Sequence, residues 1–185
     1  MAEYYLISQL PSLDGISENA PLPISEERFA ELCQRFMNKK ALKELDKLTL
    51  APPRIPEKSA SALIEKWNEG ERSLRLVLAK LRADKLNKHF ETENQSFPAG
   101  LMQAARTAAE IESPMEAEKY LNKYRLDFLE TLRPMDSFSE EFVFYYGLKL
   151  KLILRIRQFD TESGRTAYKE IYDSIMNSDR SEVTQ

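Results

Sequence analysis

The sequence predicts an all-α protein of about six helices that form one elongated helical-bundle domain. Its 185 residues include only five glycines, and almost none of the chain shows the alternating β-branched pattern of strands. Apolar residues instead recur three and four positions apart over much of the chain, which is typical of helices with one buried face. With 42% hydrophobic and 31% charged residues, the chain can form a core but carries too many charges to lie in lipid.

A single helical domain is expected over residues 1–177, followed by a flexible tail over residues 178–185. Proline-rich linkers interrupt the domain near residues 21–23 and 52–56, because proline fixes φ and lacks a backbone donor. The first segment, residues 4–11, is too short for its periodicity to separate a strand from a helical turn. Its structure stays open at this stage.

The second proline-rich linker separates the first two expected helices. Ser25 can cap a helix that continues toward Leu45, because its hydroxyl can accept a backbone N–H of the first turn. A longer helix is expected from Ser59 to Phe90, with Gly70 as a weak point. The apolar faces consist of Phe29, Leu32, Cys33 and Phe36 in the first helix and of Leu63, Trp67, Leu74, Leu78 and Leu81 in the second.

The third and fourth helices have different start signals. Pro98 is acceptable in the first turn of the third helix. Ser113, Pro114 and Glu116 combine a capping box with a proline at the first helical position, which predicts the start of the fourth. The small residues that would let a neighbour approach the third helix are Ala104, Ala105, Ala108 and Ala109, and the apolar face of the fourth is Tyr120, Leu121, Tyr124, Phe128 and Leu132.

A fifth helix begins at Ser139 and contains the most unusual stretch of the chain. Apolar residues surround much of its circumference between Phe142 and Phe159, so this helix must either be the most buried one or contact a partner. A short sixth helix follows Gly164. Its apolar residues are Tyr168, Ile171, Tyr172 and Ile175.

The fifth helix also carries four cations, Lys149, Lys151, Arg155 and Arg157, with no acid in residues 142–159. One interpretation is a central core helix whose cations reach outward and pair with acidic helices. The other is a basic strip at the edge of a surface that binds an acidic partner, where charge reversal would slow association and leave the fold intact. Nucleic acid is not expected as a partner, because the formal net charge is −3 and a lone basic helix is a weak footprint.

The residues that usually build metal or nucleophilic sites are scarce. Cys33 and His89 are the only cysteine and histidine, and they fall on different expected helices, so a structural zinc site is not expected. Cys33 fits a buried apolar position, and His89 fits a surface position at a helix end. The chain has neither a Walker A loop nor a Gly-x-Gly-x-x-Gly turn, and no cofactor is expected.

Paired carboxylates occur at Glu26–Glu27 and Glu140–Glu141, in first turns where they complement the helix dipole. A small helical enzyme that holds a divalent ion through scattered carboxylates is the alternative from another class. The Glu-x-x-His signature of di-iron bundles is absent from the sequence. The candidate ligands would be Glu110, Glu112, Glu116 and Glu118.

Two stretches resemble known sequences. Residues 4–13 are similar to the start of an uncharacterised bacterial family whose genes accompany those of V-type ATPases. Residues 145–157 resemble the basic, leucine-rich helix of the C-type subunit of V/A-type ATPases, whose eukaryotic counterpart is the helical d-type subunit. A weaker similarity lies in Trp67, Glu71, Leu74 and Arg75.

The resemblance implies a non-catalytic peripheral subunit or assembly component that seats the central rotor stalk on the membrane-embedded proteolipid ring. The C-type subunit is a longer chain, so this protein would correspond to part of that socket. Other V-type ATPase subunits are the implied partners, and an unrelated helical adaptor is the alternative. A cytoplasmic location without direct membrane insertion is expected, because Glu3 stands where a secretory signal has a cation and no apolar run approaches the roughly 20 residues that span a bilayer. The resemblance adds a peripheral position at the cytoplasmic face of the membrane as an option.

Overall fold

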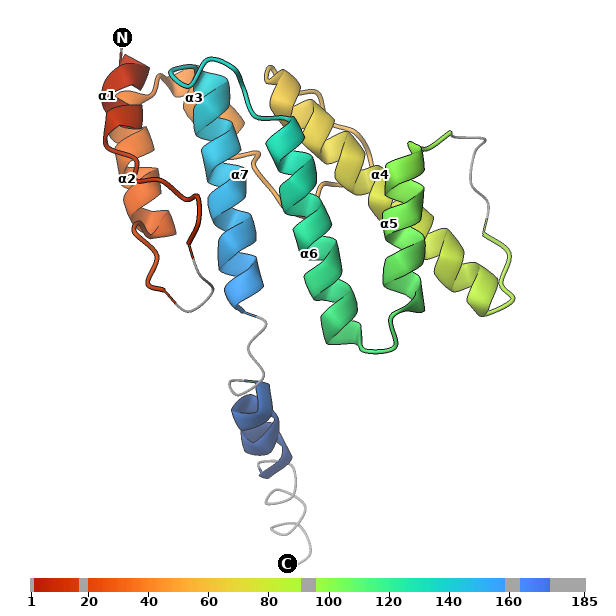
Figure 1. Ribbon diagram of the computed structural model, residues 1–185. Helices are drawn as coiled ribbons and strands as arrows, with labels where there is room; N and C mark the ends of the chain where they lie inside the picture. The colour runs from red at the N-terminus through yellow and green to blue at the C-terminus, as the bar shows by residue number, and fades with distance from the viewer. Residues whose placement is uncertain (1, 17–19, 91–95, 159–163, 174–185) are drawn as a thin grey trace, which may run out of the picture.

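The computed structural model describes residues 2–16, 20–90, 96–158 and 164–173, and every regular element in these ranges is a helix. The all-α prediction is therefore confirmed. Seven helices carry labels in Figure 1, and an eighth spans residues 164–173. The labelled helices are α1 (Ala2–Ser8), α2 (Glu26–Phe36), α3 (Lys39–Leu45), α4 (Ala62–Lys85), α5 (Ala99–Glu110), α6 (Pro114–Thr131) and α7 (Glu140–Arg157).

The helices form an elongated row with α7 near its middle (Figure 1). Helix α7 contacts α2 and α3 on one side and α6 on the other. Helix α6 contacts α5, and the long α4 packs against both α5 and α7. Because α7 touches four other helices, it is the central element of the described chain. The expected domain limits, residues 1–177, stay a prediction, and the expected tail, residues 178–185, lies outside the described residues.

Serine side chains start four of the helices. The hydroxyl oxygens of Ser25, Ser113 and Ser139 accept backbone N–H groups of the first turn over 3.1, 3.4 and 3.2 Å. These three predicted caps are confirmed. Helix α4 begins two residues later than expected, since Ser61 and not Ser59 accepts the backbone N–H of Ile64, over 3.2 Å.

Two predicted helix limits are wrong, and the number of helices differs from the expected six. The helix from Ser25 does not continue to Leu45, because the side-chain oxygen of Asn38 accepts two backbone N–H groups over 2.9 Å and starts α3 as a separate helix. Helix α4 ends at Lys85 and does not reach Phe90, because Asn87 adopts a left-handed φ of 50°. The open N-terminal segment is helical in α1, which raises the count further.

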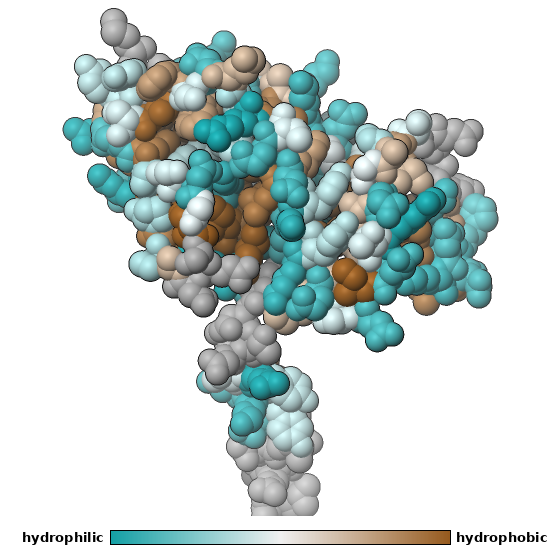
Figure 2. All heavy atoms as spheres, viewed as in Figure 1, coloured by the Kyte–Doolittle hydropathy of each residue, from teal (hydrophilic) through white to brown (hydrophobic). Residues whose placement is uncertain are grey.

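The core lies in two clusters. The larger one surrounds α7, in which all eight residues 143–150 are buried, as the first of the two alternatives for this helix expects. The smaller one joins α4, α5 and α6 and includes Leu74 and Leu121. The small residues predicted on the third helix support this packing, since Ala104, Ala105 and Ala108 of α5 are buried. Figure 2 shows hydrophilic side chains over much of the surface, with hydrophobic residues between them.

Helix 164–173 lies apart from the labelled helices in Figure 1, and each of its ten residues is exposed. Its Tyr168 and Tyr172 rings stack with centroids 6.2 Å apart. The sixth helix of the sequence analysis is thereby confirmed, although Ile175 lies outside the described residues. Among the described residues, no helix combines the length and the apolar character that crossing a bilayer requires.

Gly70 of α4 faces Phe128 of α6. Helix α4 runs through it without a break, so the expected weak point is not a helix end. A Cβ at this position would lie 2.5 Å from two ring atoms of Phe128. Phe128 in turn stacks against the buried Trp67, with ring centroids 6.1 Å apart. The absence of a side chain at Gly70 therefore allows an aromatic contact between the two helices.

We expect Gly70→Ala to lower the free energy of unfolding by about 1 kcal/mol. Displacing a packed ring costs ~1–3 kcal/mol, which exceeds the roughly 1 kcal/mol that alanine gains in helix propensity. Gly100→Ala is the matched control, because a Cβ there meets no atom within 4 Å and the same propensity gain should appear unopposed. Urea unfolding of both variants measures the difference. Equal stabilisation by the two substitutions would contradict the packing role of Gly70.

Candidate functional site

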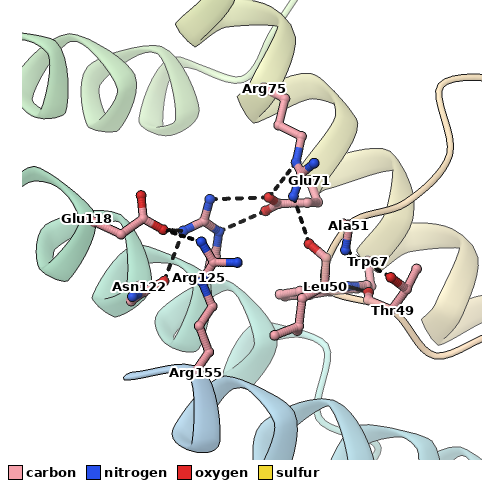
Figure 3. Close-up of polar contacts among 10 residues, drawn as sticks. All are labelled: Thr49, Leu50, Ala51, Trp67, Glu71, Arg75, Glu118, Asn122, Arg125 and Arg155. Atoms are coloured by element: carbon pink, nitrogen blue, oxygen red, sulfur yellow. Dashed lines mark hydrogen bonds and ion pairs between the residues drawn. The ribbon is translucent and has the colours of Figure 1, made fainter. Parts of the chain in front are cut away.

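Glu71 on α4 and Arg125 on α6 form a two-pronged ion pair inside the protein (Figure 3). Arg125 donates from Nε to Oε2 of Glu71 over 3.0 Å and from a terminal nitrogen to Oε1 over 3.2 Å. Only 2% of the Glu71 side chain and 8% of the Arg125 side chain are exposed. Because a buried charge without its partner is strongly destabilising, the pair holds α4 and α6 together.

The other side of the Arg125 guanidinium connects this pair to α7. Its remaining terminal nitrogen donates to Oε1 of Glu118 and to Oδ1 of Asn122, each over 3.0 Å. Arg155 of α7 donates to the same Glu118 oxygen over 2.6 Å. Glu118 therefore links two arginines from different helices, and the network joins α4, α6 and α7 (Figure 3).

The same network fastens the linker between α3 and α4. Arg75 donates from Nε to Glu71 over 2.9 Å and from a terminal nitrogen to the backbone oxygen of Leu50, also over 2.9 Å. The indole N–H of Trp67 donates to the backbone oxygen of Thr49 over 3.0 Å. The linker is thus held against α4 by two side chains about two turns apart. We refer to these contacts, centred on Glu71 and Arg125, as the buried ionic network.

A second cluster surrounds Lys149 of α7, whose side chain is only 10% exposed. Its ammonium group pairs with Asp14, which follows α1, and donates to Glu130 of α6 over 2.6 Å. It also donates to the hydroxyl of Tyr145 over 3.2 Å, and that hydroxyl donates to Glu130 over 2.7 Å. Together with the hydroxyl of Tyr146, which donates to the backbone oxygen of Pro11 over 2.8 Å, the cluster fixes the N-terminal segment to α7.

The pKa shifts in the Lys149 cluster favour the ionised forms of Asp14, Glu130 and Lys149. The hydrogen bond from Lys149 lowers the pKa of Asp14. Burial opposes ionisation of Glu130, yet the hydrogen bonds from Lys149 and Tyr145 leave its pKa below the usual value. Burial and the bond to Glu130 raise the pKa of Tyr145 to about 12. Burial alone would lower the pKa of Lys149, but its three hydrogen-bond partners raise it.

The four cations of the proposed basic strip occupy different environments. Lys149 is buried in its cluster, Lys151 pairs with Glu26 of α2, and Arg155 pairs with Glu118. Arg157 is half-buried in the last turn of α7. The contacts of Lys149, Lys151 and Arg155 agree with the first interpretation, in which the cations of a core helix pair with acidic residues of other helices. A role of the strip in partner binding stays a prediction.

The paired carboxylates lie in first helical turns, as expected. Glu141 also acts beyond its own helix, since its carboxylate accepts the hydroxyl of Ser61 over 2.8 Å and the backbone N–H of Leu63 over 3.2 Å. Its neighbour Glu140 accepts the side-chain amide of Asn38 over 2.7 Å. The start of α7 thereby fixes the starts of α4 and α3.

The residues considered as metal ligands do not converge. Glu110, Glu112 and Glu116 are exposed, while Glu118 is engaged by two arginines. In the described ranges, no group of three or more histidine, cysteine, aspartate or glutamate side chains could hold a metal ion. The two remaining candidates fit their expected environments: Cys33 is fully buried, which raises the pKa of its thiol to about 12, and His89 is exposed beyond the end of α4.

Comparison with known proteins gives one family match. Residues 99–178 match the family model DUF2764, described as a protein of unknown function. No curated protein and no solved structure matches the chain. The matched segment contains Arg125 and Lys149, whereas their partners Glu71 and Asp14 lie before it. Both clusters therefore connect the DUF2764 segment with the part of the chain that precedes it.

Sequence reasoning missed the buried ionic network, although one signal was present. Glu71 lies four residues after Trp67 and three before Leu74, so the helical repeat places it on the buried face of α4. An acid at such a position predicts a buried cation as its partner. Arg125 lies on the buried side of α6 in the same way, four residues before Leu129. The repeat could identify both residues but could not pair them.

We expect Arg125→Met to lower the free energy of unfolding by about 3 kcal/mol, because it leaves the Glu71 carboxylate buried without its main partner. The control is Arg28→Met, since the Arg28–Glu31 pair is exposed, with 58% and 65% of the two side chains accessible. Its loss should cost less than about 1 kcal/mol. Chemical unfolding of the two variants measures the contrast. Equal losses of unfolding free energy would show that the buried pair stabilises the fold no more than the exposed pair does.

The Lys149 cluster predicts a loss of stability in acid. The pKa values of Asp14 and Glu130 lie below their usual 3.8 and 4.5 in the folded chain. Their ion pairs therefore stabilise the fold above those values, and this contribution is lost as the pH falls through the lowered pKa values. The raised pKa of Lys149 acts at the other end, since its contribution is complete below 10.5 and is lost as the pH rises through the folded pKa.

Lys149→Met should flatten the dependence of the unfolding free energy on pH between about 5 and 2. The change should be small, about 1 kcal/mol or less, because water screens the half-exposed Asp14 and Glu130. Unfolding curves of both proteins across this pH range measure the slope. An unchanged slope would contradict the pairing of Lys149 with these two acids.

Proposed function

We propose that this chain is a non-catalytic component of a bacterial V-type rotary ATPase, either a peripheral subunit or an assembly factor related to the C-type socket subunit. Its partners would be other subunits of the central stalk, with the proteolipid ring as a further candidate. The proposal places the chain at the cytoplasmic face of the membrane. It rests on the resemblance of residues 4–13 and 145–157 and on one feature of the structure that favours protein binding.

That feature is the exposed helix 164–173. Tyr168 and Tyr172 are 69% and 50% exposed, and their stacked rings lie on one side of the helix with Ile171, which is 60% exposed. Tyrosine is enriched at the energetic centres of protein interfaces, because its ring buries a large area and its hydroxyl can still form a hydrogen bond. An amphipathic helix with anchors four residues apart suits a groove on another protein.

The helical body supports a role as a scaffold. The buried acids and bases described above engage one another across helices, and the charges of Asp14, Glu130 and Lys149 are stabilised in place. Groups held in this way form ties between helices, whereas a general acid or base needs a pKa near the working pH. The carboxylate-metal enzyme is the weaker alternative on geometry, because its candidate ligands Glu110, Glu112 and Glu116 are exposed and Glu118 is held by two arginines.

The experiment is purification of the native rotary ATPase from cells that make a tagged copy of the chain. We expect the chain to accompany the intact complex in a fixed ratio, and Tyr168→Ala combined with Tyr172→Ala to weaken that association at least tenfold, as expected for loss of two interface anchors. The control combines Ile55→Ala and Leu86→Ala, which remove exposed apolar side chains elsewhere. Circular dichroism checks that the fold of each variant is intact.

Reproducible absence of the wild-type chain from intact complexes would contradict the ATPase assignment. If another defined protein then accompanies the wild-type chain but not the tyrosine variant, the unrelated helical adaptor is the correct function. Equal association of the tyrosine variant and the wild type with the ATPase would reject helix 164–173 as the binding element.

A further inference from the structure

Four large apolar side chains are exposed at the start of α1 and in the loop between α6 and α7, two segments that lie at the same edge of the molecule (Figure 1). Tyr4 and Tyr5 are 55% and 61% exposed, Phe138 is 51% exposed, and Met135 is 104% exposed. The Tyr4 and Phe138 rings stack with centroids 4.9 Å apart, and the Tyr4 and Tyr5 rings meet edge to face at 6.1 Å. We refer to these four residues as the aromatic tip.

Three lysines lie beside this tip on the outer side of α3. Lys39, Lys40 and Lys43 are exposed, while Ala41 of the same helix is buried against the core. Within the described part of the chain, none of the three lysines forms an ion pair with a carboxylate. Their charges are thus available to a partner.

A short chain of contacts shows that the tip and the lysines are neighbours. Phe138 lies two residues before Glu140, whose carboxylate accepts the side-chain amide of Asn38 over 2.7 Å. Asn38 is the cap of α3, so Lys39 and Lys40 follow directly. Figure 1 shows the start of α1, helix α3 and the α6–α7 loop at the same edge of the molecule.

Two acids near the tip, Asp136 and Glu140, are already engaged. The Asp136 carboxylate accepts the backbone N–H of Phe138 over 2.9 Å, and Glu140 is bound to Asn38. These bonds do not cancel the two negative charges, but they direct both carboxylates toward backbone and side-chain donors. The three lysines, on long flexible stems, can reach outward.

We propose that this end of the protein binds the surface of an anionic lipid membrane, with the aromatic tip among the headgroups and Lys39, Lys40 and Lys43 on the lipid phosphates. Aromatic rings favour the membrane–water interface, and nearby lysines add attraction to anionic lipids. Met135 and Phe138 would enter the boundary of the acyl chains. This goes beyond the sequence analysis, which predicts no membrane insertion, and it concerns a surface other than helix 164–173, the binding element of the proposed function.

The type of cation favours a lipid surface over an acidic protein. The three cations are all lysine, which acts as a point charge on a flexible stem, whereas arginine is the usual residue for fixed two-pronged pairs with protein carboxylates. Lysines suit a fluid surface whose charges have no fixed positions.

The test is co-sedimentation of the purified chain with vesicles of phosphatidylcholine alone or mixed with phosphatidylserine. We expect binding to the mixed vesicles only, and weaker binding in high salt, because the screening length is already about 8 Å at physiological ionic strength. Neutralising Lys39, Lys40 and Lys43 with glutamine should weaken binding about 100-fold, since each lysine near an anionic surface contributes roughly fivefold.

A matched variant carries glutamine at Lys80, Lys88 and Lys123, which are exposed on other parts of the molecule. It should bind as the wild type does. Met135→Ser with Phe138→Ser should weaken binding about tenfold or more, by the apolar area withdrawn from the membrane boundary. Thermal unfolding confirms that each variant is folded before its binding is measured.

Failure of the wild-type chain to bind mixed vesicles would overturn the proposal. Equal loss of binding in the two glutamine variants would also overturn it, because the effect would then reflect overall charge. Binding of a polyglutamate peptide through the α3 lysines, without vesicle binding, would assign the surface to an acidic protein instead. None of these outcomes depends on whether the chain accompanies a rotary ATPase.

Discussion

A buried ion pair, Glu71 with Arg125, is the contact on which the arrangement of α4, α6 and α7 depends. It has almost no access to water, so both charges require the geometry that the folded chain provides. Arg75 holds the proline-rich linker to the same carboxylate, and Glu118 passes the connection to Arg155 on α7. Replacing a whole buried ionic network with apolar side chains of similar volume often leaves the free energy of unfolding unchanged. The role of this network is therefore to specify which helices meet and in which register. This specification is our hypothesis for the network, by analogy with buried polar residues that fix helix register.

The network also separates structural charges from charges that can act on partners. Lys149 and Arg155 belong to clusters that connect α7 with neighbouring helices, and the raised pKa of Lys149 reflects its three hydrogen-bond partners. Binding surfaces are therefore expected outside these clusters, where aromatic side chains and lysines are exposed. Helix 164–173 and the aromatic tip are the two surfaces that we propose. They have different chemistry, since one presents stacked tyrosines and the other combines apolar side chains with three lysines.

Local rules predicted the helices well and the contacts between them poorly. The caps at Ser25, Ser113 and Ser139 and the enclosed α7 follow from residues within one or two turns, which is the range over which capping and periodicity act. The break at Asn38 was missed because the apolar repeat continues across it. The carboxylate of Glu141 illustrates a longer range, since it caps α4 from a distance of 78 residues along the chain. The pairing of Glu71 with Arg125 spans 54 residues and depends on how α4 and α6 pack, which one sequence does not specify.

The most direct test of this account is a double-mutant cycle that joins Glu71→Leu with Arg125→Met, because it isolates the interaction between the two residues. We expect each single variant to be less stable than the double variant, with a coupling free energy of about 2 kcal/mol or more, since each single change leaves one buried charge without its main partner. Unfolding free energies of the wild type and the three variants at neutral pH supply the cycle. Losses that add within about 0.5 kcal/mol would show that the two residues act independently and would contradict the central role of the pair.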